Sequence, residues 1–194
     1  DSNNSGKPII QPIFRPGANE DNAELDNRLI IGSKGSDDSS TPTKAQYPFN
    51  SDFIGDNRNN ILLGLTKADT LLGQGGDDTL IGGSGGDRLD GGSGNDQLFG
   101  SSDNNSDTYV ISDGDDVFFD FNLDSDLIEW SGQLRDLRFS QTTYGSGAGL
   151  IDSLLISRID GSQSTTIVVG VSLEDFLSNK PYPPIIRPDD SNNS

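Results

Sequence analysis

The chain of 194 residues contains no histidine, no cysteine and no methionine. The missing histidine and cysteine exclude Ser-His-Asp and Cys-His catalysis, zinc sites built on these residues, and haem or iron–sulfur ligation. No apolar run approaches the roughly 18 residues that a membrane-spanning helix needs. Because methionine is absent, we expect the chain to be a processed product or a segment of a longer one. We also expect it not to be an enzyme.

Hydrophobic residues make up only 30% of the chain, which predicts a thin, repetitive core. The net charge is −18, and all but four of the 31 acidic residues are aspartate. Aspartate is a poor helix former, so its excess together with 24 glycines predicts turns and cation ligands. Because a chain with this negative charge repels phosphate groups, we expect neither nucleic acid nor an anionic membrane surface as a partner.

A nine-residue repeat runs through residues 55–100, with glycine at the first position and leucine at the eighth. The sixth position holds Asn60, Asp69, Asp78, Asp87 and Asp96. Glycine at the first and fourth positions predicts backbone angles that are closed to other residues. Six turn residues precede three strand residues, of which only the middle one points inward. One turn cannot supply the six to eight oxygens that Ca²⁺ prefers, but two stacked turns can.

The pattern Gly-Gly-x-Gly-x-Asp-x-apolar-x resembles the RTX (repeats-in-toxin) calcium-binding family. Residues 82–90 and 91–99 match every fixed position, and residues 107–128 resemble the end of the β-roll in serralysin-type C-terminal domains. The resemblance implies an all-β fold in which a parallel β-roll, a solenoid stapled by several Ca²⁺ ions, precedes a small antiparallel cap. The residues themselves predict that antiparallel sheet within 134–171 and one short helix at 173–178.

In such a roll alternate repeats share an edge, so the turn at 73–78 stacks on 91–96, and 64–69 stacks on 82–87. The resemblance implies Ca²⁺ ligands from side-chain carboxylates and main-chain carbonyl groups. The side chains are those of Asp69, Asp78, Asp87, Asp96 and Asp107, with Asn60 in phase, and the carbonyl groups are those of Gly73, Gly75, Gly82, Ser84, Gly91 and Ser93. Lys67 places a cation near one turn, and a two-residue insertion follows Gly100. We therefore expect degenerate sites at both ends.

Four regions follow from these patterns: an extended N-terminal tail at 1–52, the β-roll at 53–130, the antiparallel cap with its helix at 131–180, and a proline-rich C-terminal tail at 181–194. The sequence Asp-Ser-Asn-Asn-Ser both opens and closes the chain, and Pro-Ile-Ile occurs in both tails. These matched ends are either plain linkers or joints between copies in a tandem array or polymer.

Strand positions seven and nine point away from the interior of a roll. On one face they form an apolar column of Leu63, Ile81 and Phe99, with Ile61 beside it. Such a column marks a contact. The C-terminal sheet, the N-terminal stretch Ile9–Phe14 or a neighbouring subunit should cover it.

We therefore expect an extracellular, calcium-binding structural or cell-surface protein, a subunit of a Ca²⁺-dependent filament or layer. It would form a homo-oligomer or polymer through the apolar column and the N-terminal tail. The alternative is the secretion and folding module of an enzyme exported by a type I channel, such as a serralysin-like protease, with the catalytic domain absent from this chain. Ice binding would need a ladder of threonines, and Arg88 and Gln97 interrupt it.

Overall fold

The computed structural model describes residues 28–31, 52–159, 161–178 and 185–186. Its strands form two sheets. The eight-stranded sheet contains, in spatial order, β1 (Arg28–Ile31), β3 (Asn60–Thr66), β5 (Thr79–Ser84), β7 (Gln97–Phe99), β9 (Asp115–Phe119), β13 (Thr165–Val169), β12 (Ile151–Arg158) and β11 (Leu137–Tyr144). The six-stranded sheet contains β14 (Ile185–Ile186), β10 (Leu127–Glu129), β8 (Thr108–Val110), β6 (Arg88–Asp90), β4 (Thr70–Leu72) and β2 (Asp52–Ile54).

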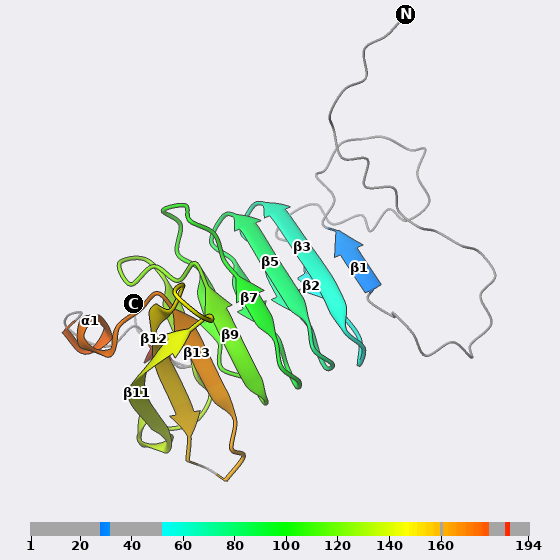
Figure 1. Cartoon of the computed structure of the whole chain (residues 1–194). Coiled ribbons are helices and arrows are strands. Elements are labelled where there is room, and N and C mark those ends of the chain that lie inside the picture. Colours follow the sequence, from blue (N-terminus) through cyan, green and yellow to red (C-terminus); the bar gives the residue numbers. More distant parts are fainter. Residues whose placement is uncertain (1–27, 32–51, 160, 179–184, 187–194) are drawn as a thin grey trace, which may run out of the picture.

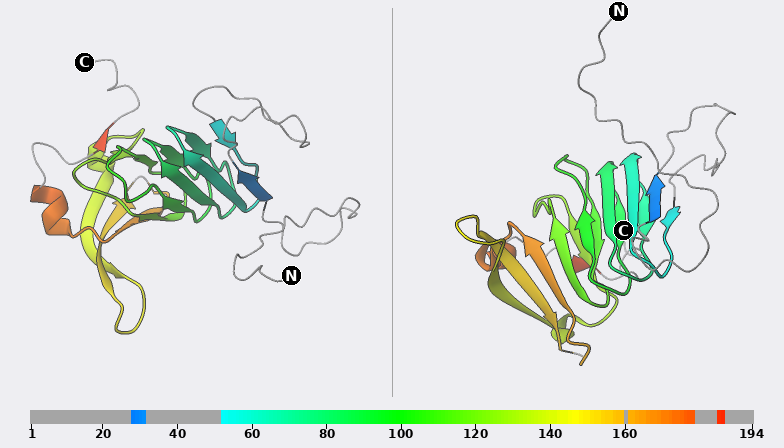
Figure 2. Two further views of the ribbon diagram at one scale, coloured as in Figure 1. Left: turned by 90° about the horizontal axis from the view of Figure 1, so that it is seen from above. Right: turned by 45° about the vertical axis from the view of Figure 1, so that its right-hand side comes forward.

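From β2 to β10 the chain alternates between the two sheets, so each strand pairs in parallel with the strand two along. Leu62 pairs with Leu80, and Leu80 with Leu98, one full coil of 18 residues at each step. Figure 1 looks onto the larger sheet, and Figure 2 shows the row of strands with β1 near one end and the helix α1 (Leu173–Ser178) near the other. The all-β parallel solenoid expected from the resemblance is confirmed.

The core is a double row of side chains between the sheets. The eighth-position leucines are fully buried, since a three-residue strand turns only its middle side chain inward. The rows comprise Leu62, Leu80, Leu98 and Phe118 from one sheet, and Phe53, Leu71, Leu89, Tyr109 and Ile128 from the other. Each of these strands therefore gives the core one inward side chain. So thin a core needs few hydrophobic residues, which explains how a chain with 30% hydrophobic residues folds.

The cap continues the larger sheet instead of forming a separate layer. β13 pairs in parallel with β9, and β12 and β11 then follow in antiparallel order. The predicted short helix is present as α1, and the Ser172 hydroxyl accepts a hydrogen bond from the Asp175 N–H at 3.0 Å. A single 3₁₀ turn, η1 (Leu134–Asp136), precedes β11.

Each predicted tail contributes one strand. β1 extends the larger sheet beside β3, and β14 extends the smaller sheet beside β10, both in parallel. Ile185 of β14 packs against the buried core. Apart from Asp52, which begins β2, the rest of the two predicted tails lies outside the described residues, including the stretch Ile9–Phe14.

Two strands are longer than the triplets that the repeat predicts. β3 and β5 continue through their following turns, where Leu65 pairs with Gly83 and Thr66 with Ser84. The turn at 64–69 has Leu65, Thr66 and Lys67 where other repeats have glycines. Leu65 is not extended there, since its φ angle is 81°, so the pairing continues across a turn and not along a straight strand.

Candidate metal centre

A ladder of aspartates runs along each of the two edges where the turns stack. In each ladder one carboxylate oxygen, Oδ1, accepts a hydrogen bond from the backbone N–H of the ladder residue one coil earlier, at 2.7–3.1 Å. One edge carries Asn60, Asp78, Asp96 and Asp116, and the other carries Asp69, Asp87, Asp107 and Asp126. The predicted stacking of alternate turns is therefore present.

The second carboxylate oxygen is left without a hydrogen bond in the middle of both ladders. The Oδ2 atoms of Asp78, Asp87, Asp96 and Asp107 are buried and have no hydrogen-bond partner among the described residues. A buried carboxylate oxygen without a partner is costly, because it has lost water and gained nothing in return. These four atoms need a cation or a proton.

Main-chain carbonyl oxygens converge on the same places. A Cβ atom added to Gly73 would lie closer than 3.0 Å to both Asp78 Oδ2 and the carbonyl oxygen of Gly91, one coil further on. Gly64 has the same relation to Asp69 Oδ2 and the Gly82 carbonyl oxygen. Gly64 and Gly73 thus each leave a space beside one carboxylate oxygen and one carbonyl oxygen.

This donor set fits Ca²⁺, a hard cation that takes only oxygen ligands and accepts main-chain carbonyl groups readily. Among the described residues, no three acidic side chains gather around one point, so a cation here would depend on carbonyl groups as well as carboxylates. Asp78, Asp87, Asp96 and Asp107, with carbonyl groups of first-position glycines such as Gly91, would hold the ions. Calcium would supply the positive charge that lets these turns stack.

Burial also raises the pKa of the ladder carboxyl groups. Loss of water is the largest cause, and hydrogen bonds from the backbone oppose it. The pKa is raised to about 7 for Asp78, Asp107 and Asp116, and to about 6 for Asp87 and Asp96. Without a cation, the charged form of the ladder is therefore disfavoured near neutral pH.

The role expected of the first-position glycines was wrong in one respect. Positive φ angles occur at the second and fourth positions of the turn, as in Gly92 (97°) and Gly94 (130°), and not at Gly91. The first position requires glycine because a side chain there would occupy the space of the converging oxygens. At the second position Leu65 and Gln74 adopt φ angles of 81° and 78°, so the turn geometry persists where the glycine is missing.

The other predicted ligands also lie in the stack of turns. Gly75 pairs with Ser93 along the edge, and Ser84 pairs with Thr66 as part of β5. Asn60 is buried, and its Oδ1 accepts the N–H of Asp56 at 2.7 Å within its own turn. Lys67 is exposed.

Sequence analysis missed two members of the ladders, Asp116 and Asp126. Both are buried, yet both have partners for Oδ2: Ser112 Oγ donates to Asp116 and the Asn122 N–H donates to Asp126, each at 2.8 Å. The insertion after Gly100 breaks the nine-residue period, so their spacing hid them. Coil steps of 20 and 19 residues, in place of 18, are the signal that would have found them.

A family model for the RTX calcium-binding nonapeptide repeat, four copies long, matches residues 54–89 and 73–107. The chain carries an RTX β-roll. RTX nonapeptide repeats bind calcium ions, and the buried aspartate ladders provide the oxygens for it. No curated protein matches the chain. RTX repeats occur in enzymes and non-enzymes alike, so the match carries no conclusion about catalysis.

We predict that calcium is required for the RTX β-roll to fold. With excess chelator at neutral pH, the far-ultraviolet circular dichroism should lose its β signal, because stacked carboxylates then repel one another. Added Ca²⁺ should restore the signal with a midpoint of about 10⁻⁴–10⁻³ M, the range of extracellular calcium modules. A spectrum unchanged in chelator would contradict this.

We predict that Asp96→Asn raises the calcium concentration at the folding midpoint about tenfold or more, because it removes a ligand charge but keeps the hydrogen-bond acceptor. Asp77→Asn is the matched control. Asp77 is exposed, and its Oδ1 accepts the Asn95 N–H at 2.9 Å. Asn95 Oδ1 accepts the Asp115 N–H in the same way, so an asparagine side chain fills this position one coil further on. Calcium titrations followed by circular dichroism should separate the two variants, and equal shifts would mean that the inner ladder does not bind the ion.

The raised pKa values predict different pH effects with and without calcium. In chelator the folded ladder takes up protons that the unfolded chain, with aspartates near 3.8, does not, so the free energy of unfolding should rise as pH falls from about 7 to about 4. With calcium bound, the folded ladder and the unfolded chain both lack these protons between about pH 7 and about pH 5, so the free energy of unfolding of the calcium-loaded roll should change little over that range. Circular dichroism at fixed pH steps measures both, and a β signal in chelator that is flat over this range would contradict the first effect.

Proposed function

We propose that the chain is a secreted, calcium-folded structural module that assembles with further copies of itself outside the cell, and that it is not an enzyme. RTX repeat proteins are typically secreted, and no helix within the described ranges is long and apolar enough to cross a membrane. Calcium at the concentrations found outside cells would switch the roll from unfolded to folded after export. Assembly would then follow folding.

The observation that carries the proposal is the outer face of the larger sheet. Leu63, Ile81, Phe99 and Phe119 stand in register on neighbouring strands and form one apolar column. The rings of Phe99 and Phe119 stack at 4.4 Å, and Tyr144 of β11 meets Phe119 edge-on at 5.4 Å. The cap thus covers one end of the column, whereas Ile81 stays 37% exposed.

The outer face of the smaller sheet is different. There Arg88 forms an ion pair with Glu129 at 2.8 Å and with Asp90 at 3.4 Å. The apolar column of the larger sheet has no such charged cluster, and apolar strips on a water-facing sheet mark contacts. A second copy of the same chain is the partner that this proposal names.

The place of β14 supports a head-to-tail arrangement. β14 lies in the segment Pro184-Ile185-Ile186-Arg187-Pro188 and adds a strand to the smaller sheet beside β10. The N-terminal tail contains Pro12-Ile13-Phe14-Arg15-Pro16, which differs from it at one position. The N-terminal segment of a second copy resembles β14 and would take the place of β14 beside β10, since strand addition to a sheet edge is a common mode of association.

We predict that deleting residues 1–16 abolishes assembly and leaves the roll folded. The full chain in saturating Ca²⁺ should sediment as an oligomer or polymer in analytical ultracentrifugation, and the truncated chain as a monomer with an unchanged β signal. Deleting only residues 1–5, which keeps Pro12–Pro16, is the matched control and should not affect assembly.

Substitution Ile81→Asp in the full chain tests the apolar face separately, and it should weaken assembly at unchanged calcium affinity. A full chain that stays monomeric in saturating Ca²⁺, or a truncated chain that still polymerises, would refute the proposal. The first of these results would favour the folding module of an exported enzyme, and the intact mass of the native gene product would then reveal an attached catalytic domain.

A further inference from the structure

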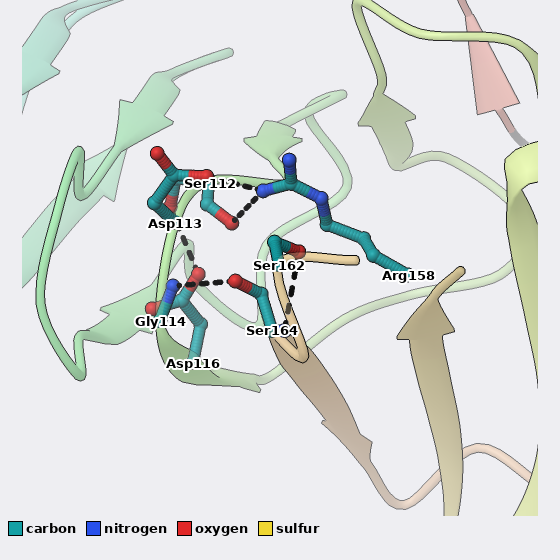
Figure 3. A network of polar contacts seen from close by, with 7 residues as sticks. All are labelled: Ser112, Asp113, Gly114, Asp116, Arg158, Ser162 and Ser164. Atoms are coloured by element: carbon teal, nitrogen blue, oxygen red, sulfur yellow. Dashed lines mark hydrogen bonds and ion pairs between the residues drawn. The ribbon is translucent and has the colours of Figure 1, made fainter. Parts of the chain in front are cut away.

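The last glycine-aspartate turn on one edge, residues 111–116, has no further nonapeptide turn above it. In its place lie the end of β12 and the loop that leads into β13, with Arg158, Ser162 and Ser164 around the turn (Figure 3). Every other turn on this edge is followed by another turn one coil further on. The contacts that the cap makes with the turn at 111–116 therefore determine where the series of cation sites ends.

Side chains of the cap reproduce the hydrogen bonds that a further turn would make. Within the stack, the Gly94 N–H donates to the Asp113 carbonyl oxygen at 2.9 Å. At the last turn, the Gly114 N–H donates to Ser164 Oγ at 3.1 Å. A hydroxyl group therefore replaces the carbonyl group of the missing turn.

The outer ladder ends in the same manner. Asn95 Oδ1 accepts the backbone N–H of Asp115 at 2.9 Å, whereas Asp115 Oδ1 accepts the hydroxyl of Thr165 at 2.7 Å. The Thr165 N–H also donates to the Gly114 carbonyl oxygen at 3.0 Å. The loop before β13 thus imitates a turn with groups that carry no charge.

The positive charge comes from Arg158. Its Nη1 atom forms an ion pair with the Asp113 carboxylate and donates to the Ser112 carbonyl oxygen at 3.3 Å. Its side chain is only 14% exposed, and its guanidinium lies 5.0 Å from the ring centre of Trp130. Arginine holds its charge at any pH of interest, and its fixed planar donors suit one carboxylate and one carbonyl oxygen.

We propose that Arg158 stands in for the final calcium ion on this edge. Its guanidinium meets one carboxylate and one main-chain carbonyl oxygen, the two kinds of oxygen that the open sites offer to Ca²⁺. The Asp113 side chain is 70% exposed, whereas the carboxylates of the open sites are buried. The Asp116 Oδ2 atom accepts the Ser112 hydroxyl at 2.8 Å, so it has a partner without a cation. The series of cation sites on this edge therefore ends before the turn at 111–116. The last positive charge is the Arg158 guanidinium, which is covalently attached and cannot dissociate.

The test is calcium uptake on folding of the full chain and of Arg158→Gln. The slope of the melting temperature against the logarithm of Ca²⁺ concentration reports the number of ions bound on folding. Trp130 is the single tryptophan, so its fluorescence follows the melting of the cap. Arg158→Gln should melt at lower temperature at low Ca²⁺ and take up one more ion on folding, because the freed oxygens then bind calcium.

Three variants complete the experiment. Arg158→Lys keeps the charge and should retain the parent slope. Arg158→Gln/Asp113→Asn lacks the carboxylate and should lose the extra ion. Arg138→Gln removes an exposed arginine from β11 of the same cap and should change neither slope nor melting temperature.

An unchanged slope in Arg158→Gln would overturn the proposal, and the role of Arg158 would then be to pack against Trp130. The same holds if the lysine variant behaves like the glutamine variant. Arg158→Met, which keeps an apolar side chain against Trp130, gives the same comparison if Arg158→Gln does not fold. Failure of both to fold in saturating Ca²⁺ would also overturn it, because calcium then does not replace the guanidinium.

Discussion

The whole structure depends on stacking buried carboxylates of like charge one coil apart. From the second residue of each ladder on, every aspartate uses Oδ1 to accept a backbone N–H of the coil before it, so these aspartates are structural and cannot be moved outward. The same burial raises the pKa of Asp78 and Asp107 to about 7, which shows how unfavourable their charge is without a partner. The thin core cannot compensate for this, since each strand contributes one inward side chain. Calcium is therefore part of the folding free energy.

Much of the roll could be predicted from the sequence because its period is regular. Glycine, aspartate and leucine recur in phase, so the alternate stacking, the inward leucines and the outward column of Leu63, Ile81 and Phe99 all follow from counting. The helix at 173–178 followed from one capping residue, Ser172. These features are local or strictly periodic.

The features that escaped prediction depend on contacts between distant residues. Asp116 and Asp126 fall out of phase after the insertion, and only the pairing of strands shows that they belong to the ladders. Tyr109 occupies an inward leucine position, but its hydroxyl also donates to the Phe119 carbonyl oxygen at 2.7 Å and accepts the Gly100 N–H at 2.8 Å. Arg158 lies 45 residues from Asp113, and no short-range pattern links the two.

The two ends of the ladders deal with charge in different ways, and this gives the roll a defined length. At the start the neutral Asn60 takes the ladder position, so the first turn contributes less negative charge. At the finish Asp126 has its oxygens bound by the Asn122 N–H, the Ser125 hydroxyl and the Asp107 N–H, while the other edge meets Arg158. Among the described residues, the middle of the stack holds buried carboxylate oxygens that accept no hydrogen bond, at Asp78, Asp87, Asp96 and Asp107. A repeat that could in principle add coils indefinitely is closed because its last turns satisfy their own carboxylates and its cap supplies a permanent cation.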